Sequence, residues 1–144
     1  MQSGQPQIKI DTQNLIKAGT IPVILAAIGG ALWLLGFLGG LLGILFWAVA
    51  LFAGYWYVNL ILKSGAKPSI VEVAINGAIL GAVVGLVYAI IAFIAFNIRF
   101  GGLFGLGIGF GFGEVISTFI QGAIAGAIAA AGWYAYKSGM IKTS

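Results

Sequence analysis

Residues 21–62 read IPVILAAIGGALWLLGFLGGLLGILFWAVALFAGYWYVNLIL, and this stretch decides the fold because it contains no charged residue. One helix needs roughly 20 residues to cross ~30 Å of hydrocarbon. The stretch is about twice that length, so it predicts two membrane-spanning helices, over 21–37 and 41–62. Glycines near residues 36–40 predict the tight turn between them.

The composition of the whole chain agrees with a membrane environment. Of its 144 residues, 61% are hydrophobic and only 7% are charged, whereas about a quarter of a soluble domain is charged. So few charges cannot cover a surface that faces water. We therefore expect residues 1–144 to form a single transmembrane domain of the all-α class.

Two further apolar runs predict a third helix over 70–96 and a fourth over 114–136. The polar loop 63–69 contains a glycine, two lysines and a proline, which suit the end of one helix and the start of the next. We predict four transmembrane helices arranged as two helical hairpins, 20–62 and 70–136.

The segments outside these helices are polar or rich in glycine. Within residues 1–19 we predict a short interfacial helix that Asp11 or Thr12 caps and Gly19 ends, with a disordered segment as the alternative. Residues 137–144 form a polar tail.

A Gly-rich connection over 98–113 joins the third and fourth helices. It is compatible with a re-entrant loop, a short hairpin on the headgroups or an apolar loop docked against a partner. A phosphate-binding loop is disfavoured, because the segment lacks the strand, the helix and the lysine that such a loop needs.

The positions of the cations predict the topology. The chain contains Lys9, Lys17, Lys63, Lys67, Arg99, Lys137 and Lys142. With four spans, all of them except Arg99 fall on one side, which the positive-inside rule assigns to the cytoplasm. We expect a multi-pass protein of the cell membrane with both termini cytoplasmic. The cations lie between apolar runs, so they predict contact with membrane lipids and not with nucleic acid.

Small residues recur at every fourth position in the last two helices. The positions are Gly77, Gly81 and Gly85 in the third, and Gly122, Gly126 and Ala130 in the fourth. Small side chains let two helix backbones approach closely in lipid. These strips predict packing of the two helices on each other, or of one of them on another subunit.

Polar side chains in or near the spans are the candidates for a site. Glu72 and Asn76 lie four residues apart on one helix face, although Ser69-x-x-Glu72 is also a capping box. In the fourth helix, Glu114, Thr118 and Gln121 share a face.

This second stripe suits either a hydrated path or hydrogen bonds to a neighbouring helix. Arg99 is expected on the same side of the membrane as Glu114 and could pair with it. The predicted interfacial anchors are Trp56, Tyr57, Trp133 and Tyr134.

The chain contains no cysteine and no histidine, and only three acidic residues. We therefore predict no catalytic residue, no metal site and no cofactor held by ligation, so an enzyme is not expected. A lipid, a quinone or a carotenoid needs no ligating residue and remains possible.

These features predict a small structural or accessory subunit of a larger membrane assembly, in contact with other subunits or with copies of itself. One alternative is an oligomeric transporter or channel for ions or small solutes. A further alternative is a self-assembling membrane coat protein.

Overall fold

The computed structural model describes residues 10–35, 46–65, 67–104 and 112–138, without the side chains of 99–104, 112 and 114. Within these ranges the regular elements are all helical. They are α1 (Thr12–Ala31), the short 3₁₀ helix η1 (Leu32–Leu35), α3 (Phe46–Ser64), α4 (Ile70–Phe104) and α5 (Phe112–Lys137).

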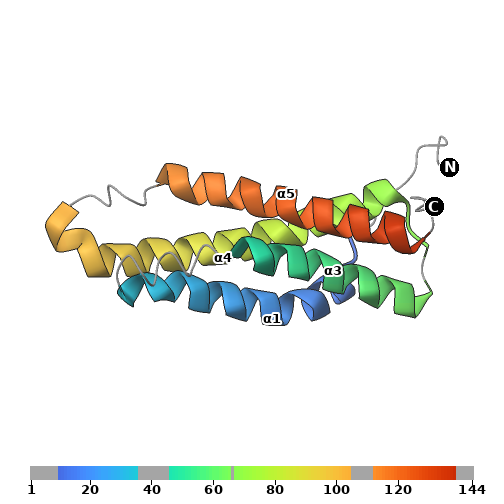
Figure 1. Ribbon diagram of the computed structural model, residues 1–144, viewed down its shortest axis with the longest axis horizontal. Coiled ribbons are helices and arrows are strands. Elements are labelled where there is room, and N and C mark those ends of the chain that lie inside the picture. Colours follow the sequence, from blue (N-terminus) through green and yellow to red (C-terminus); the bar gives the residue numbers. More distant parts are fainter. Residues whose placement is uncertain (1–9, 36–45, 66, 105–111, 139–144) are drawn as a thin grey trace.

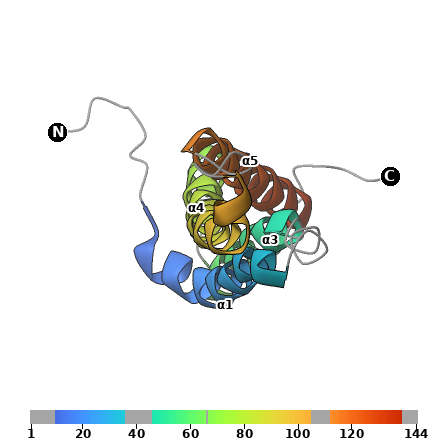
Figure 2. The same ribbon diagram turned by 90° about the vertical axis from the view of Figure 1, so that its left-hand side faces the viewer.

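The four long helices lie side by side along the long axis of the molecule (Figure 1). Helix α4 packs against each of the other three (Figure 2). The start of α1, the connection from α3 to α4 and the end of α5 lie at one end of the bundle, which we call the loop end (Figure 1).

Four helices are long and apolar enough to cross a membrane. These spans are Thr12–Leu35, Phe46–Ser64, Ile70–Ile98 and Val115–Lys137. The shortest has 19 residues, or about 28 Å at 1.5 Å per residue, close to the ~30 Å of a hydrocarbon core. The prediction of an all-α protein with four such helices is confirmed.

The start of α1 differs from the prediction. Asp11 is the N-cap, because its carboxylate accepts a hydrogen bond from the backbone N–H of Asn14 at 3.3 Å. The helix then continues through Gly19 to Ala31. The prediction of a separate interfacial helix that ends at Gly19 is therefore wrong. A Cβ built on Gly19 would lie 2.9 Å from Leu80 Cδ1. This glycine therefore brings α1 close to α4 and does not end a helix.

The end of α3 behaves as the sequence predicts. Gly65 follows Ser64 with φ +79°, and among the described residues it is the one glycine with positive φ. Its backbone N–H donates to the carbonyl oxygen of Leu62 at 3.3 Å. A left-handed glycine is a common way to end a helix, and here it turns the chain toward α4.

Helix α4 extends beyond residue 96 and includes residues 97–104, so the first part of the Gly-rich connection 98–113 is helical. Helix α5 begins at Phe112 and not at Glu114. A helix pairs its own backbone groups, which an irregular segment in an apolar medium cannot do. Residues 105–111 lie outside the described part of the chain, so the conformations proposed for that connection remain predictions.

The closest approach in the bundle is between α4 and α5. A Cβ built on Gly81 would overlap the carbonyl oxygen of Gly122, and one built on Gly122 would overlap that of Gly81. A Cβ on Gly126 would likewise meet the carbonyl oxygen of Gly77. The two backbones therefore touch directly, as small-residue packing in membranes allows. We call this contact the glycine seam.

The remaining strip residues extend the same seam. A Cβ on Gly77 would lie 2.5 Å from the Ala130 Cβ, and one on Gly85 would lie 2.6 Å from the carbonyl oxygen of Thr118. Real Cβ atoms essentially never come under 3.0 Å. All six predicted packing residues thus lie between the two helices of one chain.

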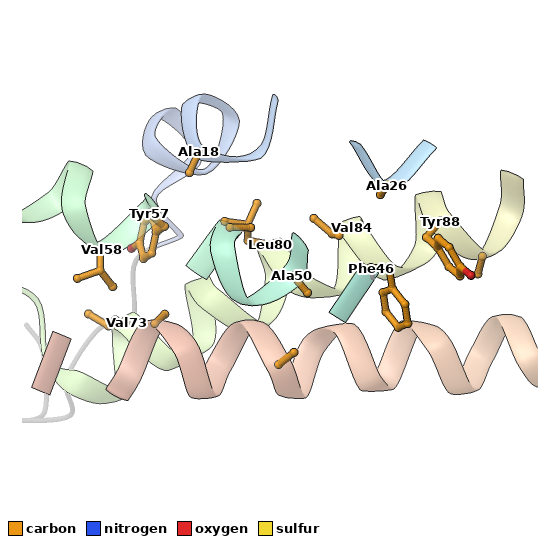
Figure 3. Close-up of a cluster of buried hydrophobic side chains, with 14 of the residues drawn as sticks. Ala18, Ala26, Phe46, Ala50, Tyr57, Val58, Val73, Leu80, Val84 and Tyr88 are labelled. Carbon is orange, nitrogen blue, oxygen red and sulfur yellow. The ribbon is translucent and has the colours of Figure 1, made fainter. Parts of the chain in front are cut away.

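Two glycines outside the predicted strips also allow close packing. A Cβ on Gly54 in α3 would lie 2.9 Å from the Gly126 carbonyl oxygen, and one on Gly30 in α1 would lie 2.7 Å from that of Tyr88. Gly132 in α5 has nothing within 4 Å of its built Cβ. Buried apolar side chains fill the space between the helices (Figure 3), including Phe46, which stacks on Tyr88 at 4.7 Å between ring centroids.

We expect Gly81→Ala to lower the free energy of unfolding by about 1–3 kcal/mol, because the added methyl overlaps a backbone oxygen that cannot move alone. Gly132→Ala is the matched control: its methyl enters open space and alanine favours a helix by about 1 kcal/mol. Unfolding of both variants in detergent micelles measures the difference. Equal stability of the two variants would contradict direct backbone contact between α4 and α5 at Gly81.

Candidate functional site

A polar hollow opens at the loop end of the bundle, with a volume of about 600 Å³. The start of α1, the last turns of α3, the connecting loop and the first turn of α4 form its walls. Its lining residues are Ile10, Asp11, Thr12, Gln13, Tyr57, Ile61, Lys67, Pro68 and Glu72. Four of these side chains, from Asp11, Tyr57, Lys67 and Glu72, are ionisable.

Asn76 holds the start of α1 against α4 at this hollow. Its side chain is 0% exposed. Its Oδ1 accepts a hydrogen bond from the backbone N–H of Asp11 at 2.8 Å, and its Nδ2 donates to the carbonyl oxygen of Glu72 at 2.8 Å. The N–H of Asp11 precedes the helix and has no partner within α1. Asn76 therefore supplies the acceptor that α1 itself does not offer to this N–H.

Glu72 has a structural role and also lines the hollow. Its backbone N–H donates to Ser69 Oγ at 3.1 Å, as the predicted capping box requires. Its half-buried side chain is part of the hollow wall. The structure thus places Glu72 and Asn76 close together, with Asn76 in contact with the start of α1 and the Glu72 side chain at the wall of the hollow.

Asp11, Tyr57 and Lys67 complete the polar lining. The Asp11 carboxylate accepts from Asn14 Nδ2 at 2.8 Å and is half-buried. Tyr57 is 1% exposed and lines the hollow together with Asp11 and Glu72. The Tyr134 hydroxyl donates to the carbonyl oxygen of Pro68 at 2.6 Å, which ties the loop that carries Lys67 to α5.

The second predicted stripe, on α5, lies elsewhere and joins helices. Gln121 Nε2 donates to Ser117 Oγ at 2.9 Å, and Gln121 Oε1 accepts from the indole Nε1 of Trp47 in α3 at 3.0 Å. Thr118 is buried beside the glycine seam. The side chains of Arg99 and Glu114 lie outside the described part, so their pairing remains a prediction.

Tryptophan side chains join helices in two further places. Trp33 Nε1 donates to the Tyr88 hydroxyl at 3.2 Å, which connects η1 to α4. Trp133 Nε1 donates to Asn59 Oδ1 at 3.1 Å, which connects α5 to α3. Sequence reasoning missed both contacts. The available signal was that Asn59, an amide in an apolar span, needs a partner.

The predicted interfacial anchors divide into two pairs. Tyr57 and Tyr134 are 1% and 5% exposed, so they do not lie on the outer surface of the bundle, where an interfacial anchor would lie, and that prediction is wrong. Both rings belong to the buried core between the helices. Trp56 and Trp133 are half-buried, and Trp133 lies among aromatic rings, with Lys137 Nζ 5.4 Å from its ring centroid.

Comparison with known proteins identifies no relative: no family model, no curated protein and no solved structure matches the chain. In the described part of the chain, no three residues of the types His, Cys, Asp and Glu come together in a way that could hold a metal ion. The ionisable groups around the hollow are the carboxylates of Asp11 and Glu72, the amine of Lys67 and the phenol of Tyr57.

We expect Asn76→Ala to cost about 1–3 kcal/mol, because the part-buried N–H of Asp11 loses its acceptor. Hydrogen exchange at residues 11–15 should accelerate. Asn97→Ala is the control, since Asn97 Nδ2 donates only within α4, to the carbonyl oxygen of Phe93. Unchanged exchange in the Asn76 variant would contradict its role at the start of α1.

Trp133→Phe and Asn59→Leu, alone and together, measure the bond between α5 and α3. We expect a coupling free energy of about 0.6 kcal/mol and at most ~1.7 kcal/mol, the range for polar contacts between helices in membranes. The same cycle with Trp33→Phe in place of Trp133→Phe should give no coupling, because the Trp33 indole bonds to Tyr88 and not to Asn59. A coupling of zero in the first cycle would show that the bond does not stabilise the bundle.

Proposed function

We propose that this multi-pass chain is a small non-catalytic subunit, a structural or accessory component of a larger membrane assembly. The observation that carries the proposal is the use made of polar groups in the described spans. Asn59, Asn76 and Gln121 hydrogen-bond to other helices. The glycine seam brings α4 and α5 into backbone contact, so a solute path along it would require the two helices to separate.

The outer surface supports the same proposal. Ile116, Ile120, Ile124 and Ile128 are all largely exposed on α5. Their spacing of four places them in one ridge, and β-branched side chains keep few rotamers in a helix. A stiff ridge loses little entropy when it packs against lipid or against a neighbouring helix.

We also propose that the two hairpins are α1 with α3 and α4 with α5, each pair being in contact. The loop end would face the cytoplasm, with both termini on that side of the cell membrane. Lys63, Lys67 and Lys137 lie at this end, as the positive-inside rule requires.

An oligomeric transporter is the second candidate, and one observation favours it. Glu72 lines a hollow that opens at one end of the bundle, where a carboxylate can attract cations. The four helices pack closely on one another in the described part of the chain, so in this proposal several copies form the path between them.

Native mass spectrometry of the protein, extracted gently from its own membrane, distinguishes these functions. We expect it to arrive with other polypeptides in a fixed ratio, because a structural subunit is bound stoichiometrically. Gly81→Ala should weaken this association, whereas Gly132→Ala should leave it unchanged. A chain that arrives alone or as a closed homo-oligomer would overturn the accessory role and favour transport.

A further inference from the structure

The polar hollow has an apolar neighbour. A groove of about 560 Å³ lies between α1 and α4 and shares Ile10 and Thr12 with the hollow as walls. The rest of its lining is nearly all aliphatic: Leu15, Ile16, Gly19, Thr20, Val23 and Ile24 from α1, with Ile79, Leu80 and Val83 from α4. The two cavities therefore place a charged environment directly beside a hydrocarbon-lined one.

The charges in the polar hollow favour one orientation of ligand. Asp11 and Glu72 provide two carboxylates, and Lys67 provides one ammonium group. A ligand with a cationic group near the carboxylates and an anionic group near Lys67 complements all three. An anion without a cationic group would bring its charge close to both carboxylates and be repelled.

Tyr57 gives a second and independent indication of a ligand. Its side chain is 1% exposed and lines the hollow, and no described residue forms a hydrogen bond with its hydroxyl. No fully enclosed polar side-chain atom among the described residues lacks a partner, so this hydroxyl opens onto the hollow. A bound group that donates to the hydroxyl oxygen or accepts from it would complete the site.

We infer that the hollow and the groove together bind one phospholipid with a primary-ammonium headgroup, of the phosphatidylethanolamine type. The ammonium group carries three N–H donors, which match the carboxylates of Asp11 and Glu72 and the hydroxyl oxygen of Tyr57. The Lys67 ammonium pairs with the lipid phosphate. An acyl chain occupies the groove between α1 and α4.

The neighbouring groove is what identifies the ligand as a lipid. A soluble amine would satisfy the carboxylates and leave the aliphatic walls of the groove uncovered, whereas an acyl chain packs against those walls while its headgroup lies in the hollow. Phosphatidylcholine is a poorer match, because its trimethylammonium group has no N–H to donate. Phosphatidylglycerol has no cation for the carboxylates.

The test is native mass spectrometry of the purified protein in micelles that contain phosphatidylethanolamine, phosphatidylcholine and phosphatidylglycerol with identical acyl chains, in equal amounts. We expect one retained phosphatidylethanolamine, favoured at least tenfold over each of the other two. Tyr57→Phe and Glu72→Gln should each lower this preference severalfold, because the first removes a hydrogen-bond acceptor and the second removes a negative charge. Equal retention of the three lipids, or a preference for phosphatidylglycerol, would overturn the inference.

Matched controls keep the result specific. Tyr136→Phe removes a hydroxyl from an exposed tyrosine of α5, and Glu114→Gln removes a carboxylate at the opposite end of α5 from the loop end. Both should retain the lipid preference, and its loss in either variant would assign the effect to something other than the hollow. Displacement of the lipid by millimolar glycerophosphoethanolamine, which has the headgroup without acyl chains, would show a soluble amine site and overturn the lipid assignment.

Discussion

Direct contact between the backbones of α4 and α5 is the constraint on which the rest of the bundle depends. In lipid no hydrophobic effect drives helices together, so association rests on close packing and hydrogen bonds. Gly126 lies at the centre of this arrangement, because a Cβ on Gly54 of α3 would also reach its carbonyl oxygen. Glycine at these positions brings three helices close enough for dispersion forces between backbones to hold them.

Polar side chains supply the second kind of cohesion. Indole and amide groups that would be costly in hydrocarbon are paired across helices, through Trp47 with Gln121 and Trp133 with Asn59. These bonds define rotation and register along α3 and α5, where alanine and isoleucine alone allow several positions. Packing thus brings the helices together, and the few polar groups select one arrangement.

The sequence predicted the parts of this structure that depend on local periodicity. An uncharged run shows where helices span, and glycines at every fourth residue show a helix face that can approach another. It could not show that Trp47 reaches Gln121 or that Tyr57 and Asp11 line one hollow, because these residues are far apart along the chain. Gly19 was misread because a glycine ends a helix or brings it against a neighbour according to what lies opposite, and here Leu80 of α4 lies opposite.

The hydrogen bond from the Asp11 N–H to Asn76 also has a consequence for biosynthesis. The two residues are 65 positions apart, so the acceptor for the start of α1 is made only after α3 has been synthesised. A chain emerging from the ribosome inserts α1 before this partner exists. The first span must therefore enter the bilayer before the start of its helix has this partner, and the synthesis of α4 then supplies the acceptor.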